Sequence, residues 1–325
     1  MLLAALGLLN AGSAAVVETS DFGCSAWMTY WDADAALEEL RAFPDGFESL
    51  VCFEAFFDAD GYWYLPPESE QLLKDMQERG VPVYLSLVND VLQEDGTVVQ
   101  KSRDFLAQEL LSPAARSRHI SKIMQLVRTY SLTGLEIDYE NMKKDTELWS
   151  AFAVFLEQLS IILAHNGVSL RVVMDCEAPE RAVFPEGPVY ICMCYNLYGY
   201  HSGPGPKADI AFLQELGESW KAVPGEVHMA FATGGFLWKG DTVEKAMTET
   251  AALEWLAQQN VTPKRDKASG ALRAVVRGEE KNTLWYADGE TPSLWRDTLR
   301  DMGYTHFDLF RLGGNAADSL AAFLK

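Results

Sequence analysis

The stretch Thr133-Gly134-Leu135-Glu136-Ile137-Asp138-Tyr139-Glu140 decides how the rest of the chain is interpreted, because it carries three carboxylates at alternate positions. Side chains alternate between the two faces of a β-strand, so Glu136, Asp138 and Glu140 share one face. Crowded carboxylates raise the pKa of at least one of them, and a carboxyl group that stays protonated can act as an acid. The pattern therefore predicts a strand with chemistry on one face, although the solvated face of an ordinary half-buried strand alternates in the same way.

The segments on either side of this strand favour the chemical interpretation. Helical stretches are expected at about residues 113–130 before it and 146–164 after it. A strand between helices usually belongs to a parallel sheet that is covered on both faces. The three acids are therefore expected to face the interior of the fold.

The same alternation of strands and helices runs along the whole chain. Eight strands are expected at residues 25–31, 50–57, 81–88, 132–140, 169–175, 189–195, 226–232 and 305–310. Helices are expected at residues 35–42, 68–79, 114–130, 148–164, 210–219, 242–259, 293–302 and 316–324. This count predicts an α/β fold, a (β/α)8 TIM barrel. Short strands at 261–265, 272–277 and 283–286 predict a small antiparallel β excursion between strand seven and the last helices.

Composition limits the possible partners. The chain has 325 residues, of which 48% are hydrophobic, enough for a large core. Its formal net charge of −20 argues against a nucleic-acid partner. The sequence contains no run of about 18 apolar residues, the length that would predict a membrane span. It does not indicate the oligomeric state.

The amino terminus and the cysteines bear on location. Residues 1–20 contain an apolar run and then small residues, like a secretory signal without its positive start. We therefore expect a signal or separate amino-terminal segment at 1–20, a barrel domain at 21–325, and a bacterial protein that is secreted or in the cell envelope. The five cysteines have no zinc-type spacing and are expected to be buried free thiols.

Catalytic groups of such barrels lie at the carboxyl ends of the strands. Glu140 ends the fourth predicted strand, and Tyr195 and Asn196 end the sixth. Tyr198 follows in a loop rich in glycine and proline, where exposure for binding is plausible. Metal binding by the three alternate acids is an alternative, but side chains along one flat strand rarely converge on one ion, so no metal or cofactor is expected.

At this point the chain resembles the family 18 glycoside hydrolases, which include chitinases and related N-acetylglucosaminidases. Residues 134–140 are similar to the end of that family's D-G-x-D-x-D-x-E strand, and Met193-Cys194-Tyr195-Asn196 is similar to its M-x-Y-D element. Gly235-Phe236-Leu237-Trp238 resembles the end of its seventh strand. Trp285-Tyr286-Ala287-Asp288 and Phe310-Arg311-Leu312-Gly313-Gly314 resemble elements of the branch with bacterial spore-cortex and spore-germination hydrolases.

The resemblance implies hydrolysis of β-1,4 bonds in N-acetylglucosamine-containing glycans such as peptidoglycan or chitin. The anomeric configuration would be retained with the help of the substrate itself, an exception to the two-carboxylate scheme of most glycosidases. Glu140 would be the acid and then the base. Asp138 would orient the substrate's 2-acetamido N–H, Tyr195 would bind the acetamido oxygen, and Glu136 would hold Asp138 from below. Further substrate contacts are implied for Glu136, Asn196, Tyr198, Trp238 and Phe310.

The chain departs from the family pattern at several positions. Thr133 stands in place of the first motif acid, and Glu136 is one methylene longer than the usual aspartate. Asn196 replaces a common acid, and Phe310 replaces a tryptophan with a smaller stacking face. An inactive, lectin-like barrel that binds glycans is therefore the alternative, and an unrelated carboxylate-dependent barrel enzyme is a third possibility. Tyr195 and Trp238 could also be ordinary packing residues.

Overall fold

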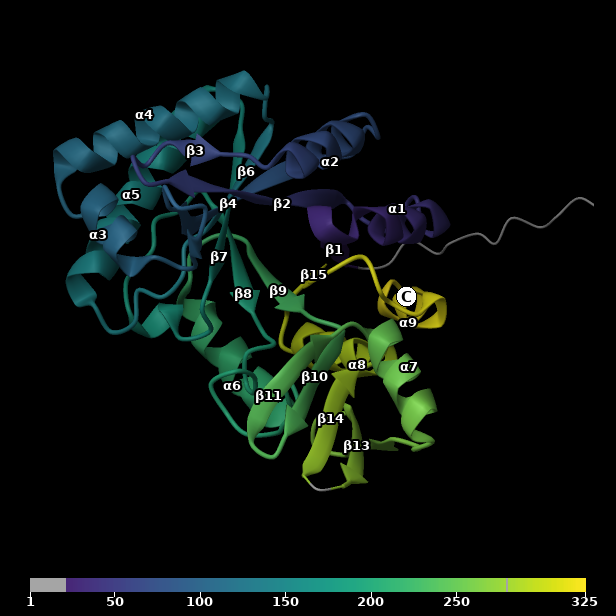
Figure 1. The fold of residues 1–325 in the computed structure, drawn as a ribbon. Coiled ribbons are helices and arrows are strands. Elements are labelled where there is room, and N and C mark those ends of the chain that lie inside the picture. Colours follow the sequence, from purple (N-terminus) through teal and green to yellow (C-terminus); the bar gives the residue numbers. More distant parts are fainter. Residues whose placement is uncertain (1–21, 279) are drawn as a thin grey trace, which may run out of the picture.

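A closed barrel of parallel strands dominates the computed structural model, which describes residues 22–278 and 280–325 (Figure 1). In barrel order its eight strands in this part of the chain are β1 (Gly23–Thr29), β2 (Ser49–Asp58), β4 (Val83–Leu92), β6 (Gly134–Asp138), β7 (Ser169–Met174), β8 (Val189–Met193), β9 (Val227–Phe231) and β15 (His306–Leu309). β15 pairs with β1 and closes the ring. The predicted (β/α)8 barrel is confirmed, whereas the predicted segment 1–20 lies outside the described residues.

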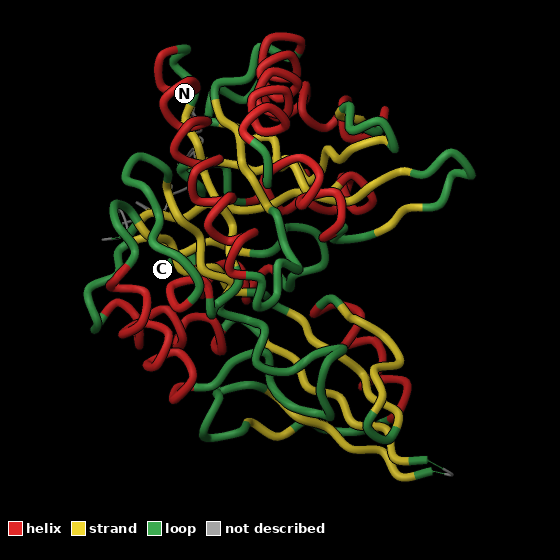
Figure 2. Tube along the Cα trace, turned by 90° about the vertical axis from the view of Figure 1, so that its left-hand side faces the viewer, coloured by secondary structure: helices red, strands yellow, loops and turns green. Residues whose placement is uncertain are grey.

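Helices cover the outside of the barrel, as the alternation of the sequence predicted (Figures 1 and 2). They are α1 (Ala33–Ala42), α2 (Pro67–Gln77), α3 (Arg103–Leu110), α4 (Pro113–Thr129), α5 (Thr146–His165), α6 (Ile210–Ser219), α8 (Glu290–Arg300) and α9 (Ala317–Phe323). α3 was not expected from the sequence. It begins after Ser102, whose hydroxyl accepts a hydrogen bond from the Phe105 N–H.

A second, antiparallel sheet lies beside the barrel (Figure 1). Its strands are β10 (Gly234–Lys239), β11 (Thr242–Met247), β12 (Lys264–Arg265), β13 (Leu272–Arg277) and β14 (Lys281–Ala287), in the order β11-β10-β14-β13-β12. The predicted excursion is thus confirmed, but it begins earlier and is larger than expected. It packs against α7 (Glu249–Gln259).

Two boundaries in this region were wrong. The helix expected at 242–259 is β11 followed by α7, because the Thr248 hydroxyl caps a helix that starts only at Glu249. The residues 235–238 belong to β10 and not to the end of a barrel strand. The chain leaves the barrel at Gly234, whose φ is +62°, and a Cβ at Gly235 would lie 1.9 Å from the Trp285 carbonyl oxygen.

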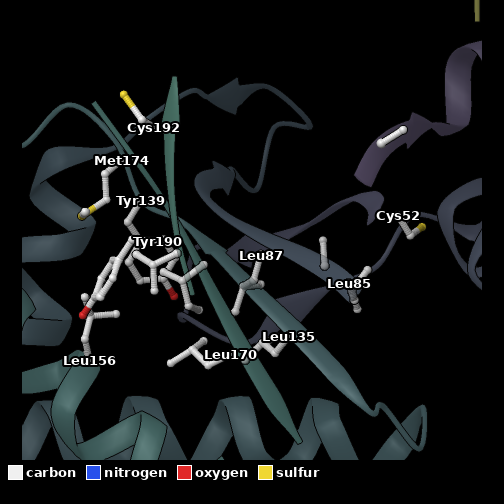
Figure 3. Packing of buried hydrophobic residues seen from close by; sticks show 14 of the residues in the cluster. Cys52, Leu85, Leu87, Leu135, Tyr139, Leu156, Leu170, Met174, Tyr190 and Cys192 are labelled. Carbon is white, nitrogen blue, oxygen red and sulfur yellow. The ribbon is translucent and has the colours of Figure 1, made fainter. Parts of the chain in front are cut away.

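The two faces of β6 differ as predicted. Leu135 and Ile137, with Tyr139 just after the strand, are buried in the apolar cluster of the core, and Figure 3 shows Leu135 and Tyr139 in this packing. Glu136 points inward and is fully buried. The acids of this strand therefore face the inside of the barrel.

Helix α5 supplies much of the same apolar layer. By length and composition it could cross a membrane. One side of it is buried in the core through residues that include Phe152, Phe155 and Leu159. This is the packing of a barrel helix. The cysteines are all free in the described chain, and only Cys176 is partly accessible, which confirms the prediction of free thiols.

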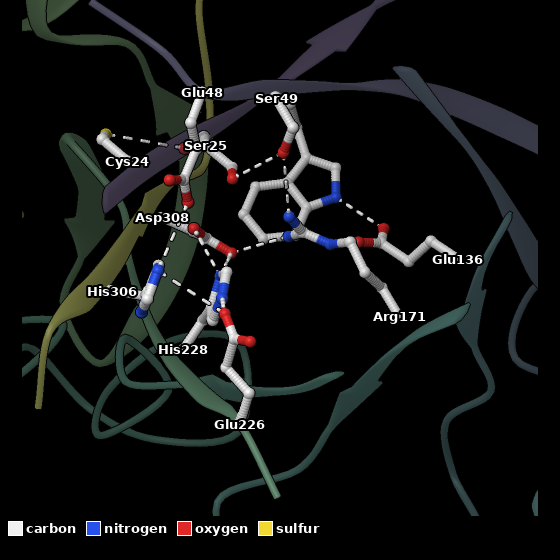
Figure 4. Close-up of polar contacts among 11 residues, drawn as sticks. Cys24, Ser25, Glu48, Ser49, Glu136, Arg171, Glu226, His228, His306 and Asp308 are labelled. Carbon is white, nitrogen blue, oxygen red and sulfur yellow. Dashed lines mark hydrogen bonds and ion pairs between the residues drawn. The ribbon is translucent and has the colours of Figure 1, made fainter. Parts of the chain in front are cut away.

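The interior of the barrel towards its amino-terminal end is polar. One arginine, Arg171 of β7, forms the central contacts there (Figure 4). Its Nε donates to Glu136 Oε2 at 3.1 Å, and its Nη2 donates to Asp308 Oδ2 at 2.6 Å. Glu136 also accepts a hydrogen bond of 2.7 Å from the Trp27 indole N–H. Each of these charged side chains is almost completely buried, so each depends on its partners.

We predict that Arg171→Met destabilises the protein by about 3–5 kcal/mol, because it leaves the buried Glu136 without its counter-charge and Asp308 with His228 alone. Urea denaturation followed by circular dichroism measures this change. Arg118→Met, on the exposed side of α4, is the matched control and should leave the free energy of unfolding unchanged. Equal stability of the two variants would show that the buried ion pairs are not needed.

Candidate active site

Glu140 lies two residues after the end of β6, at the carboxyl end of the barrel. Its backbone N–H donates to Asn89 Oδ1 at 2.9 Å, and its carbonyl accepts from Asn89 Nδ2 at 3.1 Å. Asn89 is a buried residue of β4, the neighbouring strand. The main chain of Glu140 is therefore held at the point where its side chain enters the barrel mouth.

Asp138 and Glu140 have raised pKa values. For Asp138 the pKa is well above its ordinary value because the carboxyl group is buried and lies near Glu140 and Glu136. Burial also raises the pKa of Glu140, and Lys101 opposes that rise. Asp138 Oδ1 has no hydrogen-bond partner among the described residues. One carboxylate atom in the mouth is thus free to accept a hydrogen bond from a ligand.

Lys101 is a residue of the candidate site that the sequence analysis missed. Its ammonium group lies 2.6 Å from Glu140 Oε1. The loop that carries it is fixed by a hydrogen bond of 2.7 Å from the Lys101 N–H to Asp90 and one of 2.9 Å from Asn141 Nδ2 to the Lys101 carbonyl. The Lys101 side chain is itself half exposed. No sequence pattern marks this pair, because 39 positions separate the two residues in the chain.

A cleft with two lobes opens on either side of Glu140 and Lys101, which line both lobes. The larger lobe has a volume of about 720 Å³ and extends towards β8, β9 and the second sheet. The smaller lobe has a volume of about 280 Å³ and extends over the ends of β1, β2 and β4. The cleft therefore crosses the barrel mouth with Glu140 near its middle.

Aromatic rings line the cleft along its length. Tyr195 and Phe310 stack in the larger lobe with ring centroids 5.9 Å apart. Phe53 packs edge-on against Phe310 and lines the smaller lobe. Trp31, with an exposed fraction of 50%, lines the smaller lobe, and Tyr200, with 74%, lines the larger one. Exposed rings on such a surface can stack on the apolar faces of sugars.

The other residues predicted from the sequence divide into two groups. Asn196 and Tyr198 line the larger lobe beside Tyr195. Glu136 and Trp238 are fully buried and line neither lobe. Glu136 lies below Asp138 and pairs with Arg171, whereas Trp238 packs inside the second sheet against Phe236.

Further acids at the mouth were also missed. Asp175 lines the larger lobe, and Glu54 and Asp90 line the smaller one. Burial and the nearby Asp90 raise the pKa of Glu54 to about 8. Asp175 could have been found, since it ends a predicted strand, but Glu54 carries no such mark.

Cationic groups gather in the larger lobe. Lys207 and Arg311 both line it. Burial, together with Arg311, lowers the pKa of Lys207 to about 7, and its ammonium group donates to the Thr233 carbonyl. Of the three alternate acids, Glu136 is paired with Arg171 inside the barrel and Glu140 with Lys101 at its mouth.

The loop that follows Phe310 is held by a carboxylate of α1. Glu39 accepts hydrogen bonds of 2.8 Å from the N–H groups of Gly313, Gly314 and Asn315. Gly314 has a φ of +96°, and a Cβ there would lie 2.6 Å from Thr248. Glycine at this position therefore allows the tight turn that supports the floor of the larger lobe.

No protein-family model matches the chain, and no curated protein is similar to it in sequence. Its structure, however, resembles solved ones. The spore cortex-lytic enzyme SleL of Bacillus cereus superposes with a TM-score of 0.76 and 18% identity, covering 93% of this chain and 74% of that one. A chitinase from Chromobacterium violaceum gives a TM-score of 0.78 and 16% identity, covering 93% and 98%. A class V chitinase from Nicotiana tobaccum, in a mutant form in complex with NAG4, gives 0.74 and 13%, covering 93% and 98%.

These identities show a shared fold. The structural neighbours are spore cortex-lytic enzymes and class V chitinases, the same groups that the sequence resemblance indicated.

We predict that Lys101→Met raises the pKa of Glu140 further, because it removes the positive charge that favours the carboxylate. The acid form of Glu140 should then persist to higher pH. Carbon-13 NMR titration of the labelled carboxyl groups measures this shift. Lys101→Arg keeps the charge and should leave the titration close to that of the wild type; a Lys101→Met titration that moves to lower pH would contradict the prediction.

Proposed function

We propose that the chain is a glycoside hydrolase that cleaves β-1,4 bonds in N-acetylglucosamine-containing glycans, such as peptidoglycan or chitin-type polymers. The observation that carries this proposal is the pair Asp138 and Glu140, both with raised pKa values, in the middle of a cleft lined by aromatic rings. The similarity of the fold to chitinases and spore cortex-lytic enzymes supports it.

In the first step Glu140 donates its proton to the glycosidic oxygen as the bond from that oxygen to the anomeric carbon breaks. The oxygen of the substrate's own 2-acetamido group forms the new bond to the anomeric carbon and gives an oxazolinium ion. Water then attacks the anomeric carbon from the side that the leaving sugar vacated, and the bond from that carbon to the acetamido oxygen breaks, which restores the acetamido group. Glu140 takes up the proton of this water, so the configuration is retained and the acid is restored.

Asp138 and Tyr195 would serve the acetamido group. Within residues 22–278 and 280–325, one Asp138 carboxylate oxygen has no hydrogen-bond partner, which suits it to accept a hydrogen bond from the acetamido N–H. As positive charge develops on that nitrogen, the carboxylate stabilises it. Tyr195 lies near Asp138 and can donate its hydroxyl to the acetamido oxygen, since burial and the neighbouring acids raise its pKa and keep it protonated.

The sugar chain would lie across the barrel mouth with its apolar faces on the aromatic rings. Phe310, backed by Tyr195, forms the floor at the reacting sugar, and Asn196 and Tyr198 can bind its hydroxyl groups. Location in the cell envelope or outside the cell remains part of this proposal, since such polymers are found there.

A glycan-binding barrel without activity is the second candidate, and one observation favours it. Lys101 holds Glu140 in an ion pair at 2.6 Å, which favours the carboxylate over the acid form that the first step needs. In an active enzyme the half-exposed Lys101 must release Glu140 when the substrate binds.

Hydrolysis of fluorogenic chitobiose and chitotriose glycosides, with binding followed by calorimetry, separates the two candidates. We predict that Glu140→Gln lowers kcat by about 10²–10⁴-fold and leaves sugar binding intact, because the amide fills the same space but has no acidic proton. Glu147→Gln, at an exposed position of α5, is the matched control and should keep full activity. Binding without hydrolysis by the wild type would favour the lectin-like barrel, and equal hydrolysis by the wild type and Glu140→Gln would exclude the mechanism.

A further inference from the structure

A second cluster of charged side chains lies at the opposite, amino-terminal end of the barrel (Figure 4). Glu48 precedes β2, Glu226 precedes β9, His228 lies in β9, and His306 begins β15. A cavity of about 890 Å³ opens over these residues to solvent. The proposed glycosidase mechanism uses none of them.

The Nε2 atoms of the two imidazole rings face the same carboxylate oxygen, Glu226 Oε1. The rings stack with centroids 4.5 Å apart and planes 9° from parallel. His228 Nε2 lies 2.9 Å from Glu226 Oε1, and His306 Nε2 lies 3.5 Å from the same atom. Glu48 Oε1 lies 3.8 Å from His306 Nε2, and the ligand atoms of Glu48, His228 and His306 lie within 4.8 Å of one another.

We propose that Glu48, Glu226, His228 and His306 bind a divalent transition-metal ion, with zinc as the best match to the donor set. The contacts of His306 Nε2 are longer than hydrogen bonds. They are close to the separation of about 3.3 Å between two ligands that share a tetrahedral zinc ion with bonds of about 2.0 Å. Imidazole nitrogen and carboxylate oxygen are both ordinary zinc ligands, and two imidazoles disfavour magnesium or calcium.

The surroundings of the histidines fit this role. His228 Nδ1 lies 3.1 Å from Asp308 Oδ1, and Asp308 is in turn held by Arg171. A carboxylate on the second nitrogen orients a metal-binding histidine and leaves its Nε2 for the metal. His306 Nδ1 lies 3.1 Å from the Thr305 hydroxyl, so its Nε2 is also directed towards the cluster.

The charge of the cluster and the absence of a side chain at Gly23 also favour a bound cation. Glu48, Glu226 and Asp308 place three carboxylates around the two imidazoles. This concentration of negative charge attracts a cation. At Gly23 a Cβ would lie 2.4 Å from His306 Cδ2 and 2.5 Å from Glu48 Oε2, so only glycine lets these two side chains approach each other.

Such an ion would join β2, β9 and β15 at the end of the barrel that the cleft does not use. Its effect would be on stability rather than on the reaction, and the inference is independent of the proposed hydrolysis.

The test is calorimetric titration of the full chain with zinc chloride after removal of metal by a chelator. We predict one zinc ion bound by the wild type, with a rise in Tm. His306→Gln and Glu48→Gln should each weaken binding at least about tenfold, and Gly23→Ala should do so with all ligands present. His165→Gln, at an exposed position of α5, is the matched control and should bind as the wild type does.

Cobalt(II) substitution tests the type of ligand. A tetrahedral spectrum without sulfur-to-cobalt charge-transfer bands excludes the cysteines as ligands. Circular dichroism confirms that each variant is folded. No specific zinc binding by the wild type, or unchanged zinc binding by folded His306→Gln, would overturn the proposal and leave an imidazole–carboxylate network without metal.

Discussion

The ion pairs of Arg171 with Glu136 and Asp308 are the interaction on which the rest of the structure depends. They lie inside the barrel, where a carboxylate without a partner is costly. By neutralising Glu136, Arg171 allows β6 to carry a row of inward acids that would otherwise repel one another at close range. An apolar layer that includes Trp27, Val173 and Met193 lies in the same interior. The two ends of the barrel are left free for different chemistry.

Along β6 the environment of the acids changes step by step. Glu136 is fully buried and paired, Asp138 has one oxygen without a partner in the described part of the chain, and Glu140 reaches the cleft beside Lys101. A glutamate is therefore structural inside the barrel and available for reaction at the barrel mouth. Position relative to the barrel mouth, rather than the residue type, decides what each carboxylate can do.

The sequence predicts the barrel well because its signals are local: apolar strands alternate with amphipathic helices, and the acids of β6 alternate along one strand. It also places Glu140, Tyr195 and Asn196 at the mouth, since each ends a strand. Lys101 could not be predicted, because its contact with Glu140 depends on a loop whose path is set by Asp90 and Asn141. The family resemblance set Trp238 at the end of the seventh barrel strand, but the chain turns at Gly234 into β10, whose pairing with β11 and β14 no local pattern indicates. The amino-terminal cluster was missed because its four members come from three separate segments of the chain.

Inhibition by N-acetylglucosamine-thiazoline tests most directly the claim that the substrate's acetamido group takes part in the reaction. This compound mimics the cyclic oxazolinium ion that Asp138 and Tyr195 would stabilise. The proposed mechanism predicts competitive inhibition of glycoside hydrolysis by the wild type, with binding weakened in Asp138→Asn. Hydrolysis that continues unchanged at saturating thiazoline would contradict it and would point to a barrel glycosidase that works without the acetamido group.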